Sequence, residues 1–293
     1  MQAHVTVKGE DAADFLQSQF TNELRPFEVG RCVYGLWLDA KGKIQGDSYI
    51  LTEGDEAFRM VSNTLISEQL VTNLSKHIVA DEVEFAIEAL GEAYAFTNRR
   101  LLDQTPLSVA ENSWLRLNGE HYICSAPLRP VVAFSDESAS RSLKSALEDP
   151  GFAEVSAQQA YCSRLEADMP DILEEVGLGA LPAEGGLEAA TISFTKGCYL
   201  GQEVVARLHN LGRPTRQLYL IRKGKAVETK KRTNTPSALY DDTGKVIGEL
   251  RTLDPDSQTF GIASMKLRAT AINQTVMDAD NRCWTVERIF PNP

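Results

Sequence analysis

Residues 193–213 read "SFTKGCYLGQEVVARLHNLGR", and this stretch places one cysteine, Cys198, just before a helical pattern. Apolar residues recur after the cysteine at the spacing of a single helical face: Val204, Val205, Leu208 and Leu211. Gly212 and Pro214 are typical of a helix end. The pattern predicts a helix that begins soon after Cys198 and ends before Gly212. Residues 191–194, which precede the cysteine, are predicted to be the end of a strand.

The position of Cys198 favours a reactive thiol. The unpaired N–H groups at a helix N-terminus attract an anion, and Lys196 stands close by in the sequence, so both features stabilise a thiolate. The other interpretation is structural, because most cysteines are inert, small apolar side chains and Gly197 would fit a tight turn. The spacing alone leaves both interpretations open.

Composition restricts the class of protein. The 293 residues suggest about two domains, and 43% hydrophobic with 24% charged residues is typical of globular chains. The net charge of −11 disfavours non-specific nucleic-acid binding, so we do not expect nucleic acid as a direct partner. The one basic run, residues 222–232, is typical of a solvated face, with polyglutamate or RNA contact as the alternative.

Membrane and metal sites are not expected. No apolar run approaches the roughly 18 residues of a membrane span, and the N-terminus has no signal-like segment, so we expect a cytoplasmic protein. The five cysteines are scattered, with no C-x-x-C pair: Cys32, Cys124, Cys162, Cys198 and Cys283. They suggest neither a disulfide framework nor a zinc site, so no metal ligands are assigned.

Strand-like and helix-like patterns share the first part of the chain. Residues 4–9 alternate as a strand, residues 10–20 follow as a short helix, and Asp39-Ala40-Lys41-Gly42 is a candidate hairpin turn. After residue 214, short strand-like runs alternate with turns such as 242–245, which indicates a small β-barrel or sandwich. No glycine-rich dinucleotide or P-loop motif is present. The sequence therefore predicts an α+β fold.

The motif "KGCYLGQE", residues 196–203, resembles the signature of the YgfZ family, folate-binding relatives of the glycine-cleavage T-protein. Four further segments resemble that family: "VKGEDAADFLQSQFTNEL" (7–24), "SRLEADMPDI" (163–172), "LPAEGGLEAATISFTKG" (181–197) and "VVARLHNLGRPTRQL" (204–218). The resemblance covers most of the chain and is most specific in residues 163–216.

The resemblance implies a particular fold and ligand. It predicts interleaved ferredoxin-like and T-protein-like α+β subdomains around a central folate pocket, with a C-terminal β-barrel. The two subdomains are expected in residues 1–212 and the barrel in residues 213–293. Tetrahydrofolate is the expected cofactor.

The resemblance also assigns site residues. The glutamate of the family's "R-[IL]-E-A-G" segment hydrogen-bonds the pterin, and Glu166 stands there; a carboxylate can accept two parallel N–H bonds from an aminopterin. The alternative for Glu166 is a surface carboxylate or an ion pair with Arg164. Arg216 and Arg207 are expected to face the folate tail, or else to solvate the domain junction. Tyr199 is expected to line the pterin slot, or else to pack in the core.

Two departures from the family bear on these expectations. Asp168 stands where the family has glycine, so the backbone turn after Glu166 is expected to differ. Residues 62–70, "SNTLISEQL", contain no Lys-Asp pair, and the chain has no clear match to the catalytic aspartate of the T-protein. Whether the chain is an enzyme is therefore left open.

The resulting hypothesis is a folate-binding, YgfZ-like accessory protein in iron–sulfur cluster assembly or repair and in cluster-dependent tRNA modification. Cys198 and Lys196 are assigned as its catalytic residues, with Cys198 a nucleophile, an iron ligand or a structural residue. The expected partners are a reduced folate and iron–sulfur proteins or their assembly factors, with no membrane partner, and the chain is expected to be a monomer. The alternative is an aminomethyltransferase-like one-carbon transferase that uses tetrahydrofolate.

Overall fold

The structure is a computed structural model that describes residues 1–96, 109–139, 142–146, 155–224 and 233–292. Most of the basic run, residues 225–232, lies outside the described part. The chain forms two compact units: residues 1–154 with 189–203 are the N-terminal unit, and residues 155–188 with 204–293 are the C-terminal unit. In the ranges that are described, no helix is long and apolar enough to cross a membrane.

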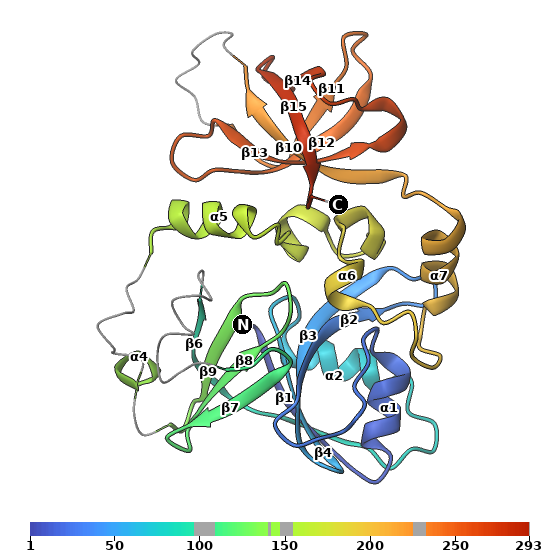
Figure 1. Ribbon diagram of the computed structural model, residues 1–293, viewed down its shortest axis with the longest axis vertical. Coiled ribbons are helices and arrows are strands. Elements are labelled where there is room, and N and C mark those ends of the chain that lie inside the picture. The colour runs from blue at the N-terminus through green and yellow to red at the C-terminus, as the bar shows by residue number, and fades with distance from the viewer. Residues whose placement is uncertain (97–108, 140–141, 147–154, 225–232, 293) are drawn as a thin grey trace. The chain divides into compact units, whose positions relative to one another are not determined.

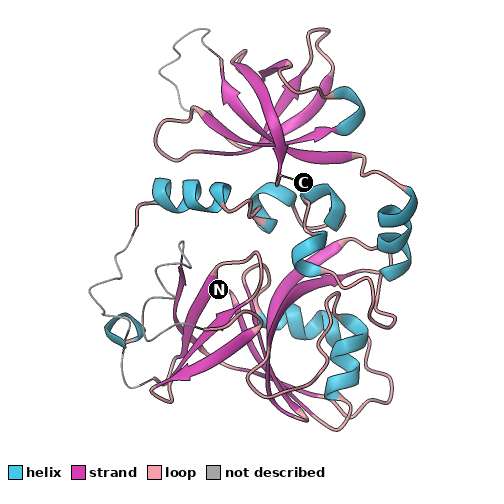
Figure 2. Cartoon of the chain, viewed as in Figure 1, coloured by secondary structure: helices cyan, strands magenta, loops and turns pink. Residues whose placement is uncertain are grey.

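The N-terminal unit contains two antiparallel sheets (Figures 1 and 2). The first has the order β2 (Cys32–Leu38), β3 (Ile44–Gly54), β4 (Ala57–Ser62), β1 (Ala3–Lys8) and β5 (Glu84–Ile87). The second has the order β6 (Leu90–Phe96), β9 (Val131–Asp136), β8 (His121–Ser125) and β7 (Ser113–Leu117). The helices of this unit are α1 (Ala12–Gln19), α2 (Ser67–Ser75), α4 (Leu143–Ala146) and, in part, α6 (Glu188–Thr191).

The predicted hairpin joins β2 to β3. Its turn is closed by two backbone bonds, from Gly42 N to Asp39 O at 2.9 Å and from Asp39 N to Lys43 O at 3.0 Å. The Asp39 carboxylate accepts the N–H groups of Lys41 and Lys43, as is usual for aspartate in turns. The expectation of a turn at residues 39–42 is confirmed.

Helix α1 packs its apolar face into the main core of the unit. Phe15 and Leu16 are buried there with Val5, Phe58 and Met60 of the first sheet. The apolar residues of α1 recur at the spacing of an amphipathic helix, so they form the face that packs against the sheet. This packing fixes the C-terminal end of α1, whose carbonyl groups are used by the candidate site.

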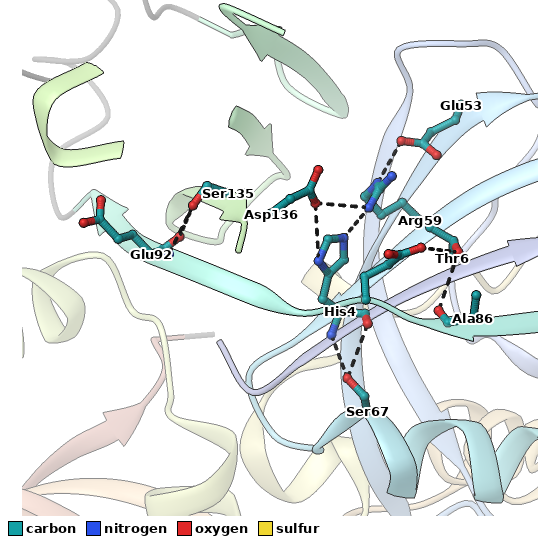
Figure 3. Close-up of polar contacts among 10 residues, drawn as sticks. His4, Thr6, Glu53, Arg59, Ser67, Ala86, Glu92, Ser135 and Asp136 are labelled. Carbon is teal, nitrogen blue, oxygen red and sulfur yellow. Dashed lines mark hydrogen bonds and ion pairs between the residues drawn. The ribbon is translucent and has the colours of Figure 1, made fainter. Parts of the chain in front are cut away.

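A buried polar cluster lies between the two sheets (Figure 3). His4 of β1 is fully buried, Arg59 of β4 contacts its Nε2 atom, and Asp136 of β9 lies 3.7 Å from its Nδ1 atom. Arg59 also donates to Glu53 at 2.8 Å, while His4 N donates to Ser67 at 3.0 Å. Burial, followed by the nearby Arg59 charge, lowers the pKa of His4 to about 4. The neutral imidazole is therefore the form that fits the fold.

The C-terminal unit is built on a closed barrel with the strand order β10 (Arg216–Lys223), β13 (Phe260–Lys266), β12 (Val246–Leu253), β11 (Ser237–Tyr240), β14 (Thr275–Asp278) and β15 (Cys283–Phe290). Its helices are α5 (Ala157–Glu166), η1 (Ile172–Val176), η2 (Pro182–Gly185), most of α7 (Gln202–Leu211) and η3 (Leu267–Ala269). The fully buried Trp284 anchors the barrel core, and its Nε1–H donates to Asp278 at 3.1 Å. The predicted mixed α and β fold with a C-terminal β-barrel is confirmed.

The buried state of His4 predicts a pH dependence of stability. The pKa of His4 is near 6.5 in the unfolded chain and about 4 in the folded chain, so below pH 6.5 the unfolded chain binds the proton first. The stability from neutral His4 is complete above pH 6.5 and is lost as the pH falls toward 4. We expect a loss of about 2 kcal/mol in the free energy of unfolding between pH 8 and pH 5.

Urea denaturation at both pH values measures this loss, with His4→Gln and His77→Gln compared with the wild type. His77 is exposed, so its substitution should leave the pH dependence unchanged. A His4→Gln protein with the same pH dependence as the wild type would exclude His4 as its source.

Candidate functional site

The C-terminal end of α1 presents a row of backbone acceptors. The last carbonyls of any helix have no partner within it, and α1 has no basic residue in its last turn to satisfy them. The chain leaves the helix at Phe20, whose φ and ψ of −91° and 142° are extended. Carbonyl groups of residues 17–22 are therefore open to another segment of the chain.

That segment is the cysteine loop, which we define as residues 192–201. The Lys196 ammonium group donates to Gln17 O at 2.7 Å, to Phe20 O at 2.7 Å and to Asn22 O at 2.9 Å. Two backbone groups of the loop donate to the carbonyls between them. The bond from Leu200 N to Ser18 O measures 3.1 Å, and so does that from Ser193 N to Thr21 O. The segment 17–22 thus accepts five hydrogen bonds from the loop.

These bonds explain why the expectation of a strand at residues 191–194 is wrong. Thr191 ends α6, and its carbonyl accepts a hydrogen bond from the Thr21 side chain at 2.7 Å. The next backbone donor, Ser193 N, bonds to Thr21 O rather than to a neighbouring strand. Because the end of α1 satisfies these polar groups, the loop needs no sheet partner. The predicted helix after the cysteine is present as α7.

Two side chains of the loop lie in opposite environments. Cys198 is exposed, whereas Tyr199 is buried, with an exposed fraction of 7%. The Lys196 Nζ atom lies 5.4 Å from the centre of the Tyr199 ring, a cation–π distance. Of these two side chains, Cys198 is therefore the one that solvent can reach.

Gly201 ends the loop against the β2–β3 turn. Its φ of +82° lies in the region that favours glycine, and a Cβ atom there would come within 2.5 Å of Asp39 O. Gly197 differs, because a Cβ atom there would meet nothing within 4 Å. Only the second glycine of the "KGCYLGQE" motif is therefore required by packing.

In the C-terminal unit, α5 carries Glu166 at its last position. Ser156 and Gln159 form a capping box at the start of this helix, with bonds of 3.2 Å and 2.9 Å. Glu166 is exposed, and its carboxylate has no hydrogen-bond or ion-pair partner among the described residues. A negative charge at a helix C-terminus is unfavourable by about 0.3–1 kcal/mol, so helix stability does not explain this residue.

The alternative of an ion pair between Glu166 and Arg164 is excluded. The Arg164 guanidinium forms two bonds to Glu175, at 2.8 Å and 2.6 Å, and donates to Met169 O at 2.7 Å. Glu175 is completely buried and also accepts from Asp171 N at 2.8 Å. Arg164 therefore holds the backbone that follows α5 and forms no ion pair with Glu166.

Asp168, which stands where the family has glycine, lies in the turn that follows α5. Asp168 has a φ of +50°, the left-handed region that glycine adopts readily. Its carboxylate accepts from Arg288 at 2.9 Å and from Asn292 N at 3.1 Å, within the same unit. These bonds offset the strain of about 1–2 kcal/mol for a non-glycine residue.

The remaining predicted residues lie elsewhere in the C-terminal unit. Arg216 begins β10, is partly buried and donates to Ser264 O at 3.2 Å. Arg207 is exposed on α7. Lys196, Cys198 and Tyr199 share the cysteine loop, while Glu166, Arg207 and Arg216 come from three separate elements of the other unit. Among the residues with described positions, no group of three His, Cys, Asp or Glu side chains could hold a metal ion.

Sequence reasoning missed the partner of Lys196 and the role of residues 17–22. A signal was present, since α1 has an acidic residue in its first turn but no basic residue to cap its end. A cation from another part of the chain is a common solution. The position of that cation, 174–179 residues along the chain, could not be read from local patterns.

Comparisons with known proteins were made for the sequence and for the fold. Residues 2–98 match the family described as the GCVT N-terminal domain. The chain is 29% identical over 234 residues to "tRNA-modifying protein YgfZ" of Escherichia fergusonii and of Shigella boydii, covering 75% of this chain and 69% of theirs.

The fold is similar to that of a glycine cleavage system aminomethyltransferase T from Bartonella henselae. The TM-score is 0.75 at 14% sequence identity, and the alignment covers 98% of this chain and 85% of that one. At this identity the comparison supports the fold alone. The predicted resemblance to YgfZ proteins and to the T-protein is confirmed by these matches taken together.

The two glycines of the cysteine loop give a matched test of the geometry. Gly201→Ala should lower the free energy of unfolding by about 2 kcal/mol or more, because the new side chain meets a positive φ and the Asp39 carbonyl. Gly197→Ala should change it by less than about 0.5 kcal/mol, since the site is open. Chemical denaturation of both proteins measures the difference. Equal effects would contradict the described packing of the loop on the turn.

Proposed function

We propose that this chain, which resembles the YgfZ proteins over three quarters of its length, is a folate-binding accessory protein of iron–sulfur metabolism. Its relatives carry the name "tRNA-modifying protein", and we extend to this chain a role in tRNA modification that depends on iron–sulfur clusters. The proposed ligand is tetrahydrofolate, and the proposed partners are iron–sulfur proteins or their assembly factors. For its organisation, we propose a folate-binding region in residues 1–212 and a barrel in residues 213–293.

The exposed Glu166 carboxylate, which has no partner among the residues that the structure describes, is the observation that carries the folate proposal. It lies at the end of a capped helix, and its neighbour Arg164 is fully engaged with Glu175. An exposed carboxylate can accept two parallel N–H bonds from the edge of an aminopterin ring. Bonds to a charged acceptor are stronger than neutral ones, which favours a role in ligand recognition.

Other residues support the folate proposal less directly. We propose that Arg207, which is exposed on α7, attracts the carboxylates of the folate tail. The Arg216 guanidinium donates one hydrogen bond to the Ser264 carbonyl of the barrel. A guanidinium has five N–H groups, so others can bond a carboxylate of the folate tail. Tyr199 is buried, so we propose that its ring packs beneath the surface and supports the loop, and that it does not stack on the pterin.

Cys198 is the proposed reactive group. Its thiol is exposed in a loop that is held by two backbone bonds and by three bonds from the Lys196 side chain, so the sulfur is reachable on an ordered segment. Reactive cysteines require access, because the thiolate is the nucleophile and the metal ligand. We propose that Cys198 acts on the iron–sulfur client, as nucleophile or as iron ligand.

The alternative is an aminomethyltransferase-like one-carbon transferase, which the fold similarity to aminomethyltransferase T favours. Against it, residues 62–70 offer no match to the catalytic aspartate of that enzyme. Glu68, one of the nearest carboxylates in that stretch, is exposed in the first turn of α2. Turnover in a reconstituted glycine cleavage system would favour the transferase, and its absence would favour the accessory protein.

Folate binding tests Glu166. We expect calorimetric titration with tetrahydrofolate to show binding that Glu166→Ala weakens by about 1.5–3 kcal/mol, or roughly 10- to 150-fold in Kd. Glu174→Ala is the matched control, because Glu174 is also an exposed carboxylate of the same unit. Equal weakening by both substitutions would point to a general charge effect and remove Glu166 from the site.

Complementation tests Cys198. In a strain that lacks its own YgfZ-like protein, Cys198→Ser should fold normally yet fail to restore iron–sulfur enzyme activity, because serine has no accessible anion at neutral pH. Iodoacetamide should label Cys198 in the folded chain, while the fully buried Cys32 and Cys124 should react only after denaturation. Full rescue by the serine variant would show that the thiol is structural.

A further inference from the structure

We propose that Lys196 is a positioning residue: it caps the C-terminal end of α1 and thereby holds the cysteine loop, with Cys198, in one conformation. This inference rests on the proposed function in one respect, since it takes Cys198 as the reactive group. It replaces the expectation that Lys196 itself is catalytic.

All three N–H donors of the ammonium group have acceptors. Nζ lies 2.7–2.9 Å from three carbonyl oxygens, and a lysine has three donors and no acceptor. No N–H group remains to bond a Cys198 thiolate or a substrate. A direct catalytic role would require Lys196 to give up at least one of these bonds.

The acceptors belong to a helix end that has no cation of its own. Gln17 lies in the last turn of α1, Phe20 is its C-cap, and Asn22 follows two residues later. A positive charge at this end interacts favourably with the helix dipole, and lysine commonly bonds the last carbonyls. Lys196 supplies that charge from a segment far along the chain, which ties the loop to the helix.

The burial of Lys196 shows that this contact is internal. The side chain has an exposed fraction of 7%, and its loop neighbours Ser193 and Leu200 donate backbone bonds to Thr21 and Ser18. Removal of the ammonium group would leave three buried or partly buried carbonyls without a donor. The loop would then lose three of the five hydrogen bonds that it donates to residues 17–22.

Titration of Lys196 supports the same role. Burial lowers the pKa of Lys196 to about 8, while the Glu23 carboxylate raises it and the Arg25 charge lowers it. The three carbonyls also favour the charged form, because a neutral amine has only two N–H donors for three acceptors. Above its pKa the amine therefore holds the loop less well.

Hydrogen exchange and alkylation of Lys196→Met test the proposal, with Lys41→Met as control. Methionine keeps the length and removes the donors, and Lys41 is an exposed lysine of the same unit. In Lys196→Met, the Ser193 and Leu200 amides should exchange at least about tenfold faster, because their local opening becomes easier. The midpoint of the pH profile of Cys198 alkylation by iodoacetamide should stay unchanged, and complementation should fall. The control should match the wild type.

Two results would overturn the proposal. An alkylation midpoint that rises by about one pH unit, with exchange unchanged, would mean that Lys196 stabilises the thiolate directly. Unchanged exchange and unchanged alkylation would mean that it does not position the loop. Neither measurement uses folate or an iron–sulfur client, so failure here is distinguishable from failure of the proposed function.

A measurement on the wild type avoids the risk that Lys196→Met does not fold. At pH 7 acetic anhydride should modify Lys41 and spare Lys196, since a buried ammonium with three acceptors is neither accessible nor free. Acetylation of Lys196 at the rate of Lys41 in the folded chain would contradict the proposal.

Discussion

The bonding of one buried ammonium group to the end of α1 is the interaction on which the N-terminal part of the candidate site depends. A buried charge is strongly unfavourable unless polar groups replace its water, and here three carbonyl oxygens do so. The same contact satisfies a helix end that would otherwise lack donors. This one interaction therefore satisfies both the buried ammonium group and the carbonyl groups at the helix end. It also orders the cysteine loop, which belongs to no sheet.

The C-terminal unit follows the same rule with different residues. Glu175 is completely buried, and the two-bond contact with Arg164, together with Asp171 N and the Thr252 hydroxyl, satisfies it. Because Arg164 bonds to Glu175, the exposed Glu166 has no partner in the part of the chain that the structure describes. In both units the buried charge is satisfied locally by hydrogen bonds, and a nearby side chain, Cys198 or Glu166, is exposed.

Local patterns predicted the parts of the fold that local physics controls. The β2–β3 turn follows from the turn chemistry of Asp39 and Gly42, and α7 follows from its apolar spacing. The prediction of a strand end at residues 191–194 was wrong because the hydrogen bonds of this segment go to Thr21, a partner that is distant in the sequence. The Arg164–Glu175 pair was missed because the nearer Glu166 offered a plausible local partner. Contacts of this kind are set by tertiary packing, and periodicity contains no information on them.

Asp168 is a non-glycine residue in the left-handed region, and its side chain has contacts that a glycine could not make. Glycine is preferred at a φ of +50° because any side chain adds strain there, and aspartate tolerates the region better than most residues. The Asp168 carboxylate then bonds Arg288 and the backbone of Asn292 near the end of the chain, which a glycine could not do. The substitution thus exchanges backbone freedom for an added contact within the unit. The turn that follows Glu166 at the end of α5 is therefore stabilised by side-chain contacts of Asp168 in place of the backbone freedom of a glycine.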